Sequence, residues 1–290
     1  MGKSKSEKLR KESQFAATMK RLQKNKLAML GLFIILFLVV VAIFAPVIAP
    51  YTAREFDLTN QFALPSLAHP FGTDELGRDL FSRIVYGARY SLSLAILSVA
   101  LGTAIGIVLG AIAGYFGGWI DNLIMRLMDV LQAIPSMLLA IVISATLGAG
   151  FVNTIIAMSI GNINMIVRML RSSILSVREQ EYIEAEQSIN CSKLRIIVKH
   201  ILPNSISPII VSVTMGMGGA LLTAAGLSYL GLGVQPPTPE WGAILSAGRS
   251  YMFDYPHLLL FPGICIMITV LAFNMLGDGL RDAMDPKLKD

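Results

Sequence analysis

A charged segment from Arg171 to His200 separates two long apolar stretches and carries the acidic run 179–186. This segment has no cluster of histidines, because His69, His200 and His257 are isolated from one another. The sequence also has no G-x-x-x-x-G-K-[ST] phosphate loop, no H-E-x-x-H zinc motif and no G-x-S-x-G nucleophile motif. These residues therefore indicate a polar element that acts by contact, and we expect no catalytic site in this chain.

A second group of reactive side chains lies earlier, where Asp74 and Glu75 stand close to Arg78. Two carboxylates near an arginine could form a binding site. However, Thr73 is a good helix N-cap, and carboxylates in the first turn complement the helix dipole. The spacing favours a capped surface helix that leads into the next apolar stretch.

The positions of the cysteines and methionines do not predict a metal site. We expect Cys191 in the polar segment and Cys265 within the last apolar stretch, which argues against a disulfide and gives no ligand spacing. The 15 methionines have no histidine or cysteine partner, so we interpret them as packing residues. We predict that the chain binds neither a metal nor a cofactor.

The composition places these residues in a membrane protein. The chain is 54% apolar and 15% charged, with a mean hydropathy of +0.64, whereas soluble domains average about 25% charged residues. A membrane-spanning helix needs roughly 20 apolar residues, and these continuous runs do not show the alternation of membrane β-strands. We predict an all-α membrane protein with six transmembrane helices, at about 27–49, 87–114, 122–147, 151–170, 204–231 and 257–280.

Basic residues predict the orientation of these spans. Residues 1–26 form a basic tail with a surface helix from Glu12 onwards, and the positive-inside rule places this tail in the cytoplasm. Six spans then bring the segment 171–203 and the C-terminus to the same side. The segments 50–86 and 232–256 carry few basic residues and should lie outside, the second as a non-helical loop rich in glycine and proline. The net charge of +5 thus reflects topology, and we expect no nucleic-acid partner.

The spans contain features that predict how they pack. Gly102, Gly106, Gly110 and Gly114 recur every fourth residue and would form a groove for a neighbouring helix, with sliding during gating as a functional alternative. Pro135 should kink the third span.

Polar residues also occur within the spans. Asn153, Asn162 and Asn164 could hydrogen-bond to other helices or line a polar pathway, and both interpretations stay open. Arg126 and Asp129 should form a pair close to the cytoplasmic interface.

The polar segment itself is expected to contain two short helices. The first covers Glu179 to Ile189 and has an apolar side, and Asn190 interrupts it. The second covers Lys193 to Ile201 and ends before Pro203. Such a helical pair suits a groove on a soluble partner. The apolar side of the first helix comprises Tyr182, Ile183, Ala185 and Ile189.

Several motifs resemble a known family. Glu184-Ala185-Glu186, Asn190 and Ile201-Leu202-Pro203 resemble the EAA loop of ABC importer permeases, which reads E-A-A, three residues, G, about nine residues and I-x-L-P. Segments 72–79, 229–233, 236–242 and 274–282 are similar to the dipeptide, oligopeptide and nickel permeases, in particular to the shorter, C-type member of their permease pair. The chain departs from the loop pattern at Asn190, which replaces a glycine expected to need a positive φ. It departs again at Glu186, which replaces an alanine and should face solvent or a basic partner residue.

The resemblance implies a permease fold of the methionine-importer type, with a core domain over 87–290 and a cytoplasmic coupling helix between spans four and five. It implies a homologous second permease, two cytoplasmic ATPases that bind ATP and Mg²⁺, and an extracytoplasmic solute-binding protein that docks on 50–86 and 232–256. The location would be the bacterial inner membrane. The ATPase-coupling residues would be Tyr182, Glu184, Ala185, Glu186, Asn190, Leu202 and Pro203, and the outer family signature would be Gly72, Thr73, Asp74, Gly77, Arg78 and Asp79.

The substrate stays open at this stage. A di- or oligopeptide is expected because the sequence has no cluster of histidine and cysteine, and nickel or a metal chelate is the alternative. An ion-coupled secondary transporter would need carboxylates near the middle of the membrane. We expect Asp129 and Asp278 to lie toward the cytoplasmic ends of their spans, which argues against that class.

Overall fold

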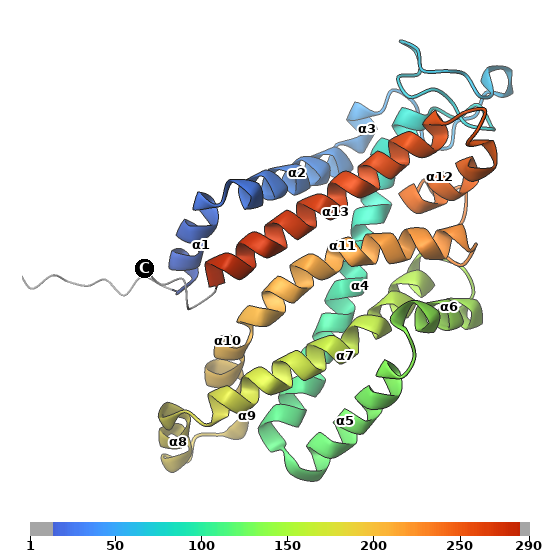
Figure 1. Cartoon of the computed structure of the whole chain (residues 1–290). Helices are drawn as coiled ribbons and strands as arrows, with labels where there is room; N and C mark the ends of the chain where they lie inside the picture. The colour runs from blue at the N-terminus through green and yellow to red at the C-terminus, as the bar shows by residue number, and fades with distance from the viewer. Residues whose placement is uncertain (1–13, 285–290) are drawn as a thin grey trace, which may run out of the picture.

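The computed structural model describes residues 14–284, which form helices and connecting loops without a β-strand (Figure 1). Residues 1–13, which contain half of the predicted basic tail, and residues 285–290 lie outside this description. The longer helices are α1 (Gln14–Lys24), α2 (Lys26–Ile43), α4 (Leu80–Phe116), α5 (Gly118–Gln132), α6 (Ser136–Leu147), α7 (Phe151–Arg178), α8 (Glu181–Ser188), α11 (Ser207–Tyr229), α12 (Trp241–Gly248) and α13 (His257–Met284). The short ones are α3 (Ala45–Ile48), η1 (Leu58–Asn60), α9 (Lys193–Arg195), η2 (Ile196–Ile201), α10 (Leu202–Ser205) and η3 (Arg249–Tyr251).

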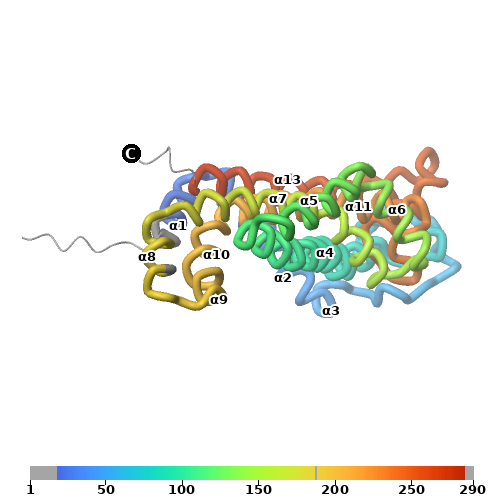
Figure 2. Tube along the Cα trace, turned by 90° about the horizontal axis from the view of Figure 1, so that it is seen from below, coloured from blue at the N-terminus to red at the C-terminus, as the bar shows by residue number. Residues whose placement is uncertain are grey.

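The molecule is elongated and has two distinct ends. Helix α2 lies along α13, and α11 lies between α13 and α7 (Figure 1). Helices α8, α9 and α10 gather with α1 at one end, and α6 and α12 lie at the other (Figure 2). We call these the α8 end and the α12 end.

Five helices within residues 14–284 are long and apolar enough to cross a membrane, namely α2, α4, α7, α11 and α13. The predicted third span is not one helix but the pair α5 and α6, bent by 86° at the break. Pro135 lies in this break, and the kink predicted there is confirmed in a much sharper form. Six spans result only if the bent pair counts as one.

Two helices extend further than their apolar stretches predict. Helix α4 begins at Leu80 and α7 continues to Arg178, well beyond 87 and 170. Hydropathy reports only the part of a helix that fits the lipid, whereas backbone hydrogen bonding continues until a cap ends it. The first residues of the charged segment are therefore an extension of a span.

The predicted helix cap at Thr73 is wrong. Asp79 caps α4 by accepting a hydrogen bond from the Ser82 backbone at 2.7 Å, and residues 74–78 form a turn rather than a helix. Thr73 is fully buried, and its hydroxyl accepts from the backbone N–H of Ala63 at 2.8 Å. Asp79 is the cap because its carboxylate stands directly before the first residue of α4.

The first predicted span, 27–49, consists of α2 and the short α3. Arg89 of α4 donates hydrogen bonds to the carbonyl oxygens of Ala42 and Ile43, the second at 2.7 Å. These carbonyls lie at the end of α2, where helical partners are missing. A charged side chain of one span thus completes the end of another.

The outer loop 232–256 is less irregular than its composition predicts. Residues 232–240 are non-helical, but Trp241–Gly248 form α12. Glu240 caps this helix by accepting hydrogen bonds from the backbone of Gly242 and Ala243 at 2.9 and 2.8 Å. The glycines and prolines that precede Glu240 are typical of an irregular loop, so the sequence does not reveal that a helix begins after this residue.

The most extensive contact between two helices joins α4 and α7. The four glycines at 102, 106, 110 and 114 all face α7. A Cβ at Gly102 would lie 2.5 Å from the carbonyl oxygen of Ser159, and one at Gly106 would lie 2.7 Å from the Cβ of Ile166. The two backbones can approach this closely only because these side chains are absent.

We predict that Gly102→Ala destabilises the chain by about 1–3 kcal/mol, because the new methyl group overlaps backbone that cannot move aside. Thermal unfolding in detergent measures this as a lower Tm. Gly219→Ala in α11 is the matched control, since no atom lies within 4 Å of a Cβ there. Equal Tm values for the two variants would show that the α4–α7 contact tolerates a side chain.

Candidate functional site

Helix α8 stands at the end of the bundle, and its Ile183 packs into the bundle core. Ile183 is fully buried in an apolar cluster with Ile174 of α7, Ala111 of α4, Ile196 of η2 and Ile209 of α11. Four separate elements therefore share a core with this short helix. Burial of an isoleucine contributes roughly 1.5–3 kcal/mol, so α8 is a fixed part of the bundle.

The rest of α8 faces away from the bundle. Tyr182, Glu184 and Ala185 are exposed, and Ile189 just beyond the helix is 75% exposed. Of the four residues expected on the apolar side, Ile183 is buried in the bundle, whereas Tyr182, Ala185 and Ile189 are exposed.

The turn after α8 uses a left-handed residue. Asn190 has φ +57°, which confirms the positive φ expected in place of the family glycine. Asparagine tolerates this conformation better than other residues with a Cβ. Glu186 differs from expectation, because its carboxylate lies 3.5 Å from Nε2 of His200 within the same chain.

Beyond the turn, the second helical stretch continues through Pro203 instead of ending before it. Helix α9 passes into the π-helical η2 and then into α10, which ends at Ser205. Proline lacks an N–H, and the side-chain amide of Asn204 donates to the carbonyl oxygen of His200 at 2.6 Å. Leu202 packs at the edge of the Ile183 cluster, whereas Pro203 is exposed.

Ion pairs and hydrogen bonds join this end of α7 to its neighbours. Nη1 of Arg178 donates to the carbonyl oxygen of Tyr115 at 3.0 Å, at the last turn of α4. Arg171 forms a two-pronged pair with Asp121 of α5, with both N–O distances 2.5 Å. Paired guanidinium and carboxylate groups of this geometry are strong and directional. Helices α4, α5 and α7 are thereby joined beside α8.

The three asparagines considered for a pathway occupy different places. Asn153 donates to the carbonyl oxygens of Leu147 and Gly148 at 2.8 and 3.0 Å and so completes the end of α6. Asn162 packs beside Gly102. Only Asn164 borders an open cavity, which has a volume of about 740 Å³.

Sequence reasoning missed Arg168, which lines the same cavity. Its Nη2 donates to Oδ1 of Asp129 at 2.6 Å, and its Nε donates to Oδ1 of Asn164 at 2.9 Å. Asp129 is the eleventh residue after the start of α5, or about 16 Å along the helix. The position of Asp129 close to the cytoplasmic interface stays a prediction. Its i,i+3 pair with Arg126 is present at 3.8 Å.

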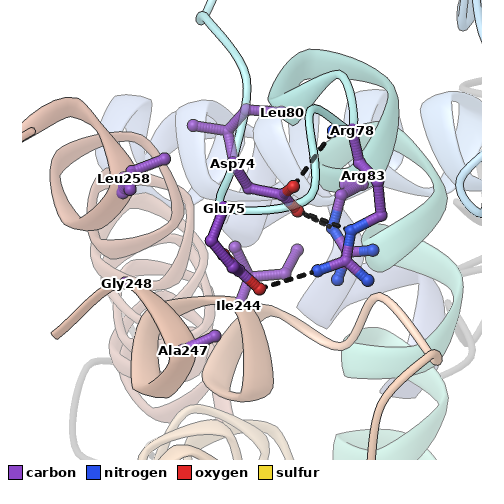
Figure 3. Close-up of a pocket in the computed structure, with 9 residues that line it drawn as sticks. All are labelled: Asp74, Glu75, Arg78, Leu80, Arg83, Ile244, Ala247, Gly248 and Leu258. Carbon is purple, nitrogen blue, oxygen red and sulfur yellow. Dashed lines mark hydrogen bonds and ion pairs between the residues drawn. The ribbon is translucent and has the colours of Figure 1, made fainter. Parts of the chain in front are cut away.

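The outer signature residues form a closed ionic cluster at the α12 end. Figure 3 shows the carboxylates of Asp74 and Glu75 turned toward Arg78 and Arg83. Nε of Arg78 donates to Asp74 at 2.7 Å, its Nη2 donates to Glu75 at 3.0 Å, and Arg83 lies 3.4 Å from Asp74. The cavity beside them holds about 10 Å³, which is room for one water molecule. This cluster therefore braces the loop against α12 and α13 and leaves no room for a larger ligand.

The glycines and Asp79 complete this brace. Gly77 has φ +69° and a Cβ there would overlap the carbonyl oxygen of Asp57. Gly72 has φ +80°, and a Cβ there would lie 2.8 Å from Nε2 of His257. Asp79 also contacts Nδ1 of His69 at 3.0 Å. Each signature residue thus serves the fold of the outer segment.

Glu240 is a second buried carboxylate at the α12 end. Besides capping α12, it accepts hydrogen bonds from the hydroxyls of Ser91 in α4 and Ser228 in α11, at 3.1 and 3.0 Å. Trp241 adds a bond from its indole N–H to the carbonyl oxygen of Ile84 at 2.9 Å. Three helices meet at one carboxylate. Only the distant serines reveal this role, and they cannot be identified from local spacing.

We predict that Glu240→Gln lowers the free energy of unfolding by about 2–3 kcal/mol, because the new NH₂ group faces donors that the carboxylate satisfied. Thermal unfolding in detergent should show a lower Tm. Asp254→Asn, the same chemical change at an exposed position of the same outer loop, should leave the Tm unchanged. A Glu240→Gln chain as stable as the parent would show that the four bonds contribute little.

We also predict that Asn190→Val weakens the turn after α8 by about 1–2 kcal/mol, since a β-branched residue is strained at φ +57°. Hydrogen exchange of the α8 amides should become roughly 5–30-fold faster. Asn190→Gly keeps the conformation and should not accelerate exchange. Equal exchange in both variants would exclude the turn as the support of α8.

Comparison with known proteins assigns the chain to a family. Residues 106–290 match the family described as binding-protein-dependent transport system inner membrane component. Residues 13–70 match the N-terminal TM domain of oligopeptide transport permease C. These two matches together extend over most of the chain.

Two curated relatives are similar over nearly their whole length. The glutathione transport system permease protein GsiD of Shigella flexneri is 51% identical over 271 residues, which are 93% of this chain and 89% of the relative. The dipeptide transport system permease protein DppC of Alkalihalophilus pseudofirmus is 50% identical over 277 residues, 96% of this chain and 91% of the relative.

Solved structures confirm the predicted fold class. A chain of the inward-facing MetNI methionine ABC transporter aligns with a TM-score of 0.57 at 19% identity, covering 71% of this chain and 98% of that one. A chain of an amino acid ABC transporter aligns with a TM-score of 0.54 at 17% identity, covering 68% and 92%. At this identity the likeness concerns the fold alone.

Proposed function

The chain belongs to the family of binding-protein-dependent transport system inner membrane components, and from this premise we propose how it works as the permease of an ABC importer. It forms half of a translocation pathway and receives its driving motion through α8. A homologous second permease forms the other half. Two ATPases at the α8 end bind ATP and Mg²⁺, so this chain is not an enzyme and binds no cofactor of its own.

One observation carries this proposal, namely that α8 is anchored on one side and unpartnered on the other. Ile183 is buried in the bundle core, while Tyr182, Glu184 and the 75% exposed Ile189 face outward. Exposed apolar and acidic groups on a rigid helix outside the lipid suit a groove on a soluble protein. We place the ATPase contact on this face.

The route from α8 to the membrane follows the helix contacts. Arg178 joins the end of α7 to the end of α4, and the four glycines let these two helices pack along most of their length. Close-packed interiors transmit displacement instead of absorbing it. A displacement of α8 therefore moves α4 and α7 as one rigid body. This motion tilts the surface of the two helices that borders the translocation pathway.

The proposed substrates are short peptides. The relatives named for glutathione and for dipeptides support this class, and neither name favours the nickel alternative. The ion-coupled alternative is set aside because the family is that of binding-protein-dependent transport.

The proposed location is the bacterial inner membrane, with both chain ends and α8 in the cytoplasm. The α12 end then faces outward, and a solute-binding protein docks on the segments 50–86 and 232–256. The ionic cluster around Asp74 and the bonds of Glu240 stiffen these segments, which suits a surface that must receive a partner without deforming.

We predict that Glu184→Arg prevents coupling, because it reverses charge on the exposed face of α8 without touching the anchor Ile183. The chain should still reach the membrane, but ATP hydrolysis stimulated by the loaded binding protein should fall at least tenfold in the reconstituted complex. Lys24→Glu, a charge reversal of equal size at the exposed end of α1, is the control and should retain stimulation. Normal stimulation in Glu184→Arg would count against α8 as the contact.

A further inference from the structure

A polar stripe runs along α7 and lines the cavity of about 740 Å³. Asn164, Arg168, Ser172 and Ser176 follow one another at intervals of four residues and so lie on one side of the helix. Gln132 of α5 and Pro208 of α11 form its other walls. The stripe leads from the middle of α7 toward the α8 end.

Two further cavities adjoin this one. A cavity of about 160 Å³ at the break between α5 and α6 shares Gln132 and Asn164 with it. A cavity of about 500 Å³ between α7, α11 and α13 shares Met165, Met169 and Pro208. These three neighbouring cavities extend from the helix break toward the α8 end, and we call them together the hollow.

The charges on this hollow lie in the second half of α7. Arg168 precedes the end of α7 by ten residues, or about 15 Å of helix. The apolar stretch of this span ends at 170, so Arg168 and its partner Asp129 lie toward the α8 end of the span. Ionised groups within a span face a partner or a water-filled path instead of lipid.

The ion pair is open on one side. The Arg168 side chain is 40% exposed and that of Asp129 is 50% exposed. Of the five guanidinium donors, the bonds to Asp129 and Asn164 use Nε and Nη2, and Nη1 has no partner among residues 14–284. Arg126 lies 3.8 Å from the same carboxylate, so the group of three carries one net positive charge. Such a site attracts an anionic group.

The adjoining cavity has a different character. Met165, Met169, Met215 and Met284 line it. Methionine side chains are flexible and polarisable and adapt to apolar groups of different shape. A ligand held by its charges at Arg168 would find adaptable walls for its side chains.

We propose that this hollow is a passage site for short peptides, in which Arg168 binds the terminal carboxylate and Asp129 binds the terminal ammonium group. The proposal rests on the peptide specificity proposed above. In the empty site the charges of Arg168 and Asp129 neutralise each other. When a zwitterionic peptide binds, its carboxylate replaces Asp129 as the partner of Arg168, and its ammonium group replaces Arg168 as the partner of Asp129. The methionines accept side chains without selecting among them.

The test uses the complete transporter in proteoliposomes, with both permeases, the ATPases and the binding protein. It measures ATP-driven uptake of radiolabelled trialanine and of trialanine with an amidated C-terminus. The binding protein is the same for every variant, so its preference cancels when each variant is compared with the wild type. Co-purification of the second permease is recorded for each complex.

We expect Arg168→Gln to reduce trialanine uptake at least tenfold, because a charge-assisted contact is lost, and to change uptake of the amide by less than twofold. Arg168→Lys keeps the positive charge but lacks the planar guanidinium group. Its trialanine uptake should therefore lie between those of the wild type and Arg168→Gln. Arg21→Gln is the control, since Arg21 belongs to α1 and lines none of the three cavities, and it should change neither uptake.

Three results would overturn the site. The first is an equal loss for both peptides in Arg168→Gln, which would mean a structural role. The second is an equal loss in Arg21→Gln, which would mean that removing any arginine lowers uptake. The third is loss of the second permease from the Arg168→Gln complex, which would make this face a subunit interface. A wild-type complex that takes up neither peptide would instead refute the peptide specificity itself.

Discussion

The close contact between α4 and α7 is the constraint on which the remaining structure depends. Four glycines remove the side chains that would hold the two backbones apart, and the longest span of the chain becomes half of a stiff pair. Every functional element is attached to this pair. Helix α8 follows from α7, the polar stripe lies on α7, and the serine that binds Glu240 belongs to α4. A displacement at one end of the α4–α7 pair is therefore transmitted to the other end.

Polar groups are distributed along the bundle according to a simple rule. At the α12 end, Asp74 and Glu240 have their oxygens filled by arginine, backbone and hydroxyl donors, which stiffens the outer loops. At the α8 end, Arg171 and Arg178 hold helix to helix. The pair of Arg168 and Asp129, by contrast, keeps part of its donors and acceptors exposed beside a cavity. Satisfied groups are structural, and the incompletely satisfied pair marks the place for a ligand.

The sequence predicts the features that depend on local chemistry. The spans follow from the length of the apolar stretches, the kink follows from the missing N–H of Pro135, and the positive φ follows from the tolerance of Asn190 for that conformation. It does not predict the cap at Asp79 or the burial of Ile183 in the bundle core. Those depend on which helices meet and how far each extends beyond the lipid. Glu240 and Ser91 are far apart in the chain, and nothing local connects them.

The central claim is that α8 moves as one body with α4 and α7. Spin labels at Leu97 of α4 and Ile189, both exposed, test it in a complex with Cys191 and Cys265 replaced by serine. About 28 Å of helix separate Leu97 from the α8 end of α4. The label distance should be the same with and without bound ATP, while the distance from Ile189 to a label on the second permease changes. An ATP-dependent change between Leu97 and Ile189 would contradict the account.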